Sequence, residues 1–96
     1  MTATEDLMAF LSKNPYYFDL TRDKAIMKIM KELEVCGKSA TQLAQDHGIE
    51  HDKLSKKLDE LVGQAVLDRA QEGSHWMYFL SFKAKKFIGL YYAAKQ

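Results

Sequence analysis

Apolar residues recur at helical spacing in the middle of the chain. Between residues 51 and 62 they lie three or four positions apart and so share one face of a helix: Leu54, Leu58 and Leu61. A shorter helix comes before it, contains Leu43 and Ala44, and ends near Gly48, because glycine is favoured just after a helix. The pattern therefore predicts two helices that meet at a sharp corner.

After residue 65 the pattern changes to one that is typical of strands. Val66–Leu67 begins a strand, Gln71–Ser74 supplies a turn, and Trp76–Leu80 forms a returning strand. We therefore predict a β-hairpin that turns around Glu72–Gly73 and lies beside the two helices.

Every residue of the returning strand is apolar or aromatic. Alternation along a strand sends Tyr78 and Leu80 to one face, which we expect to be the core face, and Met77 and Phe79 to the other. That second face either packs against the aromatic segment Tyr16–Phe18 or forms an exposed apolar patch that contacts a partner.

A further helix is predicted at the start of the chain. It runs from Thr2 to Lys13, begins with a capping box between Thr2 and Glu5, and ends at Asn14–Pro15. The aromatic residues Tyr16–Phe18 then fall in a connection. Either one or two of them pack on the core, or the three form a cluster that contacts a partner or a ligand.

The next helix is predicted to have Thr21 as its N-cap and to end near Gly37. Apolar residues recur along it at helical spacing, while lysines occupy another side: Ile26, Ile29, Met30 and Leu33. The segment Lys38–Ala40 follows as an extended stretch that can pair with the hairpin as a short third strand. After the hairpin, Ser81 caps a last helix that runs to about Ala94.

Composition and charge limit the class of protein. The 96 residues, of which 47% are hydrophobic and 28% charged, fit one globular domain over residues 1–96. The formal net charge is only +1, so any attraction to nucleic acid must come from a local surface. The single cysteine, Cys36, excludes an intrachain disulfide, and we interpret it as a small buried hydrophobe rather than a redox switch.

The sequence gives no sign of export, membrane insertion or catalysis. We expect a cytoplasmic protein without a signal peptide, and no stretch approaches the roughly 20 apolar residues of a transmembrane helix. Because a phosphate-binding loop, a nucleophile elbow and a zinc-protease helix are all missing, we do not expect an enzyme. The histidines His47, His51 and His75 are not spaced as metal ligands, so we expect neither a metal nor a cofactor.

The central stretch resembles the winged helix-turn-helix domain of small prokaryotic regulators of the arsenical-resistance-repressor and multiple-antibiotic-resistance-repressor type. The residues that carry the resemblance are Leu43–Ala44 with Gly48, the Leu54/Leu58/Leu61 face, Val66–Leu67, Glu72–Gly73, Tyr78, Leu80 and Ser81. The resemblance implies an α+β fold in the order helix, helix, short strand, helix, helix, strand, strand, helix. In such a fold the second motif helix is the recognition helix, and the hairpin is the wing.

The resemblance also implies a homodimeric transcription regulator that binds double-stranded DNA. The recognition helix would enter the major groove, while the start of the preceding helix and the wing would approach phosphates. The residues expected to contact DNA are Thr41, Gln42, His51, Asp52, Lys53, Ser55, Lys56, Lys57, Arg69, Ser74 and His75.

The recognition helix also carries acids. From Glu50 to Glu60, three lysines stand against four carboxylates, and Glu50 and Asp52 lie at the end that should approach DNA. The alternative function is therefore a winged helix that contacts a protein partner and does not bind DNA.

The last helix is apolar on more sides than one contact can cover, because Ile88 and Tyr92 widen its apolar stripe. We expect it to pair with the N-terminal helix in a two-fold homodimer interface. The residues predicted to form this interface are Leu7, Phe10, Leu11, Phe87, Leu90, Tyr91 and Ala94.

Overall fold

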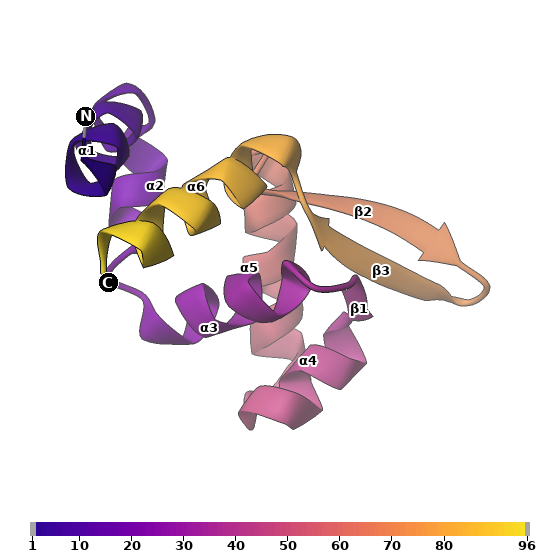
Figure 1. The fold of residues 1–96 in the computed structure, drawn as a ribbon. Coiled ribbons are helices and arrows are strands. Elements are labelled where there is room, and N and C mark those ends of the chain that lie inside the picture. Colours follow the sequence, from indigo (N-terminus) through magenta and orange to yellow (C-terminus); the bar gives the residue numbers. More distant parts are fainter. Residues whose placement is uncertain (1, 96) are drawn as a thin grey trace.

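The computed structural model describes residues 2–95, which form six helices and three strands (Figure 1). The helices are α1 (Ala3–Lys13), α2 (Pro15–Leu20), α3 (Lys24–Leu33), α4 (Ala40–His47), α5 (His51–Gly63) and α6 (Phe82–Ala94). The strands are β1 (Lys38–Ser39), β2 (Leu67–Glu72) and β3 (His75–Leu80). The predicted α+β order is confirmed, with the short helix α2 in addition.

The strands form one antiparallel sheet in the order β1-β3-β2. β3 pairs with β2 along its whole length, from Leu80 opposite Leu67 to His75 opposite Glu72. Its other edge pairs with the two residues of β1. The predicted hairpin and the short third strand are therefore both present, and in Figure 1 the hairpin projects from the helical body.

The apolar face predicted for α5 lies in the core. Leu54, Leu58 and Leu61 are 2%, 0% and 0% exposed, so the helical phase read from their spacing is correct. At the corner before α5, Gly48 has a left-handed backbone with φ of +62°, which ends α4 as predicted.

The aromatic segment Tyr16–Phe18 lies in α2 and not in a connection. Pro15 occupies the first position of this helix, where its fixed φ favours helix and its missing N–H is not needed. Tyr17 packs on the core, as we expected of part of this segment, and its ring meets that of Phe10 edge-on at 5.2 Å between centroids.

α3 begins later and ends earlier than predicted. Its N-cap is Asp23 rather than Thr21, and the Asp23 carboxylate accepts a hydrogen bond from the backbone N–H of Ile26 at 3.1 Å. Thr21 instead follows α2, where its hydroxyl donates to the carbonyl of Phe18. The helix ends at Leu33, so the residues before β1 form a connection.

The second face of β3 packs against this connection rather than against Tyr16–Phe18. Phe79 lies so close to Gly37 that a Cβ atom at residue 37 would collide with the phenylalanine ring. Phe79 is nevertheless 36% exposed, so part of the predicted apolar patch remains. Cys36 in the same connection is exposed, which contradicts its interpretation as a buried residue.

α6 is covered by its own chain on two sides. Phe87 and Ile88 are both 0% exposed, and the Phe10 ring of α1 stacks on Phe87 at 5.8 Å between centroids. Phe87 and Ile88 are therefore buried without a second chain, while the pairing of α6 with a partner chain stays a prediction. The apolar side chain that α6 does leave in solvent is Phe82, which is 88% exposed.

None of the helices formed by residues 2–95 has the length and apolar character needed to cross a lipid bilayer.

Candidate nucleic-acid interface

Helix α5, the predicted recognition helix, presents a polar face that is opposite its buried leucines. Six predicted DNA contacts lie on this helix: His51, Asp52, Lys53, Ser55, Lys56 and Lys57. Ser55 and Lys57 are partly buried and the other four are exposed. Because a helix has about 3.6 residues per turn, Asp52 and Lys56 point directly away from the core.

One flank of α5 is occupied by a polar chain of contacts. The Glu60 carboxylate accepts a hydrogen bond from the Tyr16 hydroxyl at 2.5 Å and pairs with the Lys57 ammonium at 3.0 Å. The hydrogen bond from Tyr16, followed by Lys57, lowers the pKa of Glu60 below its ordinary value. Burial, followed by the bond to Glu60, raises the pKa of Tyr16. Lys57 is therefore already partnered within the protein.

The opposite flank of α5 contacts the wing. Asp59 Oδ1 accepts hydrogen bonds from Arg69 Nη1 at 3.1 Å and from the Tyr78 hydroxyl at 3.0 Å. Burial, followed by the bond to Asp59, raises the pKa of Tyr78. The Arg69 guanidinium also lies 4.6 Å from the centroid of the Trp76 ring. Arg69, a predicted DNA contact, thus has two partners of its own.

Lys53 and Lys56 are the free cations of the recognition helix. Within residues 2–95, neither forms an ion pair, and both are exposed. They line a groove between α5 and the start of α3 together with four carboxylates: Asp23, Glu50, Asp52 and Glu60. Lys57 lines the groove as well, so three lysines stand against four carboxylates and the local charge is slightly negative.

The start of α4 holds Thr41 and Gln42, both exposed. We expected the start of this helix to approach phosphates, but the backbone N–H of Gln42 is not free to do so. It donates to the Ser39 hydroxyl at 3.1 Å. The Gln42 side chain is also engaged, since its amide donates to Asp46 at 2.8 Å. Thr41 remains the more available residue at this helix start.

The remaining predicted DNA contacts lie on different faces of the wing. Arg69 lies opposite Tyr78 on the face that meets α5, whereas His75 lies opposite Glu72 on the other face. A shallow hollow brings the second face together with the start of α4, and it is lined by Ser39, Thr41, Gln42, Glu72, His75 and Met77. Ser74 sits in the exposed turn between the strands.

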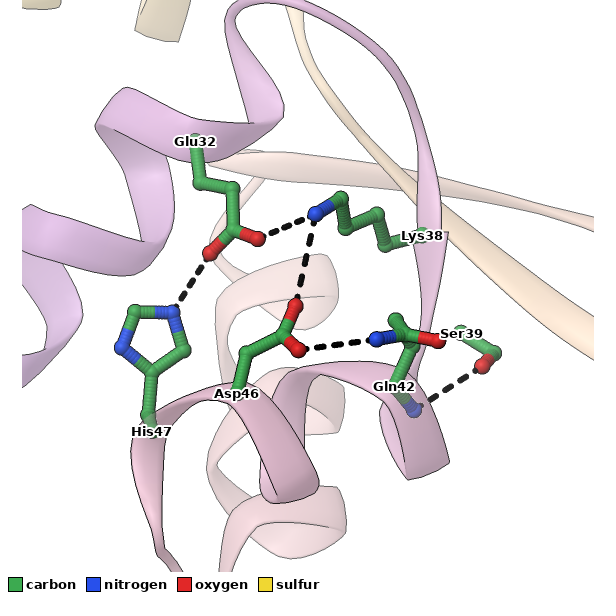
Figure 2. Close-up of polar contacts among 6 residues, drawn as sticks. All are labelled: Glu32, Lys38, Ser39, Gln42, Asp46 and His47. Carbon is green, nitrogen blue, oxygen red and sulfur yellow. Dashed lines mark hydrogen bonds and ion pairs between the residues drawn. The ribbon is translucent and has the colours of Figure 1, made fainter.

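Figure 2 shows a polar network that joins α3, β1 and α4, and that we did not predict. Glu32 of α3 contacts His47 Nε2 at 2.6 Å with one carboxylate oxygen and the Lys38 ammonium with the other. Lys38 also pairs with Asp46 at 3.3 Å. The bond to Glu32 is the main cause that raises the pKa of Lys38. Ion pairs six to fifteen residues apart leave no periodic signal, so the sequence could not reveal this network.

The network is not a metal centre. Among residues 2–95, no three His, Cys, Asp or Glu side chains are grouped so that they could hold a metal ion. In Figure 2 the Lys38 ammonium lies between Glu32 and Asp46 and supplies the cation there.

The residues predicted for the dimer interface lie at different depths. Phe10, Leu11 and Phe87 are buried within the single chain. The others are partly buried: Leu7, Leu90, Tyr91 and Ala94. Leu90 lines a hollow between α1 and α6 with Phe82, whereas Tyr91 lies on the opposite flank of α6, towards α3.

Comparison with known proteins finds similarity of structure alone. No protein-family model matches the sequence, and no curated protein matches it. A similar solved structure is the homodimeric winged helix-turn-helix DNA-binding domain of a possible ArsR-family transcriptional regulator from Mycobacterium bovis. It has a TM-score of 0.73 and 16% identity, with 97% of this chain and 82% of that chain covered.

Two further structures are comparably similar. The protein HlyU from Vibrio cholerae has a TM-score of 0.69 and 19% identity, covering 96% of this chain and 95% of its own. The adhesin competence repressor from Streptococcus pyogenes has a TM-score of 0.67 and 18% identity, covering 93% of this chain and 72% of its own. Together with the element order, these matches confirm the resemblance: the chain has the winged helix-turn-helix fold of such regulators.

Proposed function

We propose that the protein is a transcription regulator that binds double-stranded DNA as a homodimer. The observation that carries the proposal is the exposed polar face of α5, in which Lys53 and Lys56 have no ion-pair partner within residues 2–95. An α-helix fits the major groove, where lysine contacts either guanine or phosphate. The winged helix-turn-helix neighbours support the same reading by fold.

The charges predict moderate rather than strong attraction to nucleic acid. Lys57 and Arg69 are paired with carboxylates, which leaves Lys53 and Lys56 as the unpaired cations of α5 in each protomer. Each phosphate neutralised contributes about −0.9 to the slope of log affinity against log salt, so a dimer with four lysines gives a slope of roughly −3 to −4. Exposed Thr41 can add a neutral contact to a phosphate.

A two-fold dimer formed by α1 and α6 completes the proposal. Its support is the hollow between these helices, where Phe82 is 88% exposed and Leu90 is partly buried. Lys83 and Lys86 stand on the α6 side of that hollow, and Asp6 and Lys13 on the α1 side, so Asp6 can supply an opposite charge in an isologous contact. The domain from Mycobacterium bovis is itself described as homodimeric.

Selection from a random-duplex pool tests the proposal. We expect an enriched sequence with two-fold symmetry, and affinity that falls with salt as estimated above. Lys53→Gln with Lys56→Gln should reduce the slope to near zero. Lys28→Gln is the matched control, because Lys28 is an exposed lysine on α3 outside the groove. A folded protein that enriches no duplex, even at low salt, would refute DNA binding.

A protein-binding winged helix is the second candidate. The observation that favours it is the acidic start of α5, where Glu50 and Asp52 are both exposed. These carboxylates repel phosphates but suit a basic partner surface. Glu50→Gln with Asp52→Asn discriminates the two functions, because it should strengthen duplex binding if α5 faces DNA and leave it absent if α5 faces a protein.

A further inference from the structure

A single carboxylate oxygen ties both strands of the wing to the recognition helix. Asp59 Oδ1 of α5 accepts hydrogen bonds from Arg69 of β2 and from Tyr78 of β3, at 3.1 and 3.0 Å. Arg69 and Tyr78 lie directly opposite each other in the β2–β3 register. The hairpin is therefore attached to α5 at one level of the ladder, the level at which Tyr78 also pairs with Lys38 of β1.

The same arginine is also held from the side of the wing. Its guanidinium lies 4.6 Å from the Trp76 ring centroid, within the range of a cation–π contact. Trp76 and Tyr78 are two residues apart on β3 and so project from one face of the strand. A phosphate that approached Arg69 would have to compete with both the Asp59 carboxylate and the indole.

We infer that Asp59, Arg69, Tyr78 and Trp76 form a clasp that fixes the wing against the recognition helix, with Arg69 as a positioning residue instead of a phosphate contact. The side chains of Arg69 and Asp59 are 39% and 54% exposed, so the pair adds little to stability. Its effect is geometric, since the wing and α5 must reach adjacent parts of one DNA site together. This consequence for DNA rests on the proposed function, whereas the clasp itself does not.

The only tryptophan of the chain reports on the clasp without DNA. Asp59→Asn removes the charge that holds the guanidinium over Trp76, so we expect a shift in the tryptophan emission maximum and intensity. Arg69→Gln should produce the same change, and the double variant no more than either alone, because both break one contact. The matched control is Lys31→Gln, which removes an exposed ion pair on α3 and should leave the emission unchanged. Unchanged emission in Asp59→Asn would overturn the clasp.

Duplex binding then distinguishes positioning from phosphate contact. Tyr78→Phe keeps all charges and the ring but removes one hydrogen bond of the clasp. We expect it to lower the preference for the selected duplex over a random duplex by about fivefold, with no change in the salt slope. Arg69→Gln should behave in the same way. A slope reduced by about 0.9 per protomer in Arg69→Gln would instead identify a phosphate contact and refute the positioning role.

The tryptophan-emission experiment and the duplex-binding experiment can fail independently of each other. If the unmodified protein binds no duplex, the proposed function falls, and the clasp is judged by the tryptophan emission alone. If duplex binding is present but Tyr78→Phe leaves the preference and the emission unchanged, the clasp falls while the proposed function stands.

Discussion

Different interactions hold together the elements within each of the two ends of the molecule. At the end formed by α1, α2 and α6, the rings of Phe10, Tyr17 and Phe87 meet at centroid distances of 5.1 to 5.8 Å. At the end formed by α4, α5 and the hairpin, polar pairs join the elements to one another and to α3, such as Glu32 of α3 with His47 at 2.6 Å and Asp59 with Arg69 at 3.1 Å. Figure 1 shows α1 and α2 far from the wing.

The difference implies a division of roles. Buried aromatic contacts each contribute several kcal/mol of hydrophobic stabilisation and depend little on salt or pH. Partly exposed ion pairs contribute at most about 1 kcal/mol each but require a particular geometry. The aromatic end should therefore contribute strongly to the stability of the domain, beside the buried leucines of α5, and offer an association surface. The polar end should fix the orientation of α4, α5 and the wing, which is what a DNA site requires.

Phe87→Ala should have the largest effect, because this side chain is 0% exposed at the centre of the aromatic end. We expect a loss of about 3–5 kcal/mol in the free energy of unfolding, measured by denaturant titration. Phe18→Ala is the control, since Phe18 is 40% exposed on α2 and should cost less than about 1 kcal/mol. Equal losses in the two variants would contradict the division between the ends.

Charged substitutions in the hollow between α1 and α6 test the association surface. Phe82→Glu with Leu90→Glu places carboxylates in the α1–α6 hollow and should weaken a dimer by about a hundredfold or more, as losses of central apolar contacts do. Sedimentation equilibrium measures the change. Met8→Glu is the control, because Met8 is exposed on α1 but does not line the hollow. An unmodified protein that is monomeric at tens of micromolar would eliminate the dimer.

Glu32→Gln should have a smaller effect at the polar end. Glu32 is the carboxylate shared by Lys38 and His47, and its side chain is 25% exposed. Loss of its charge should cost about 1 kcal/mol of stability and loosen α4, which hydrogen exchange at the α4 amides would detect. The control is Glu34→Gln, whose partner Lys31 lies on the same helix and is half exposed. The network has no orienting role if exchange is unchanged.

Within both ends, the sequence predicted some features of the fold and missed others. Leu54, Leu58 and Leu61 follow the helical period, so their burial could be predicted from spacing. α2 was missed because six residues are too few to show a period. The proline at its start is equally consistent, in the sequence, with the end of α1.

The polar contacts could not be predicted for a different reason. Tyr16 and Glu60 are 44 residues apart, and Asp59 and Arg69 are on different elements, so their pairing depends on the finished fold. The list of predicted DNA contacts, which stays a prediction, therefore overlooked that Lys57 and Arg69 have internal partners. Residue type indicates which groups can bind a phosphate, while tertiary structure decides which of them are free to do so.

Acid should act through the polar contacts of α5 and not through the buried aromatic contacts. The hydrogen bond from Tyr16 is the main cause that holds the pKa of Glu60 below its ordinary value of 4.5, and the contact with Lys57 is the second. A depressed pKa contributes stability above the pKa of the unfolded chain, and that contribution is lost as pH falls through the folded value. At pH values below about 4.5 the melting temperature of the protein should therefore decrease, and this decrease should be smaller in Glu60→Gln. Phe87→Ala should lower the whole curve without changing its shape; a changed shape would contradict the separation of the two ends.

The smallest expected effect concerns Ala65, which joins the α5 end to the wing. It is exposed and has a left-handed backbone with φ of +60°, a region that glycine adopts without strain. Ala65→Gly relieves about 1–2 kcal/mol of strain in the folded state but loses part of that gain, because glycine makes the unfolded chain more flexible. We expect a net gain of about 0.5–1 kcal/mol. Ala70→Gly is the control of opposite sign, since Ala70 lies in the β2 ladder opposite Met77, where glycine should destabilise by about 0.5–1 kcal/mol. If both substitutions destabilise equally, Ala65 does not hold the left-handed conformation in solution, and the start of the wing has a different turn.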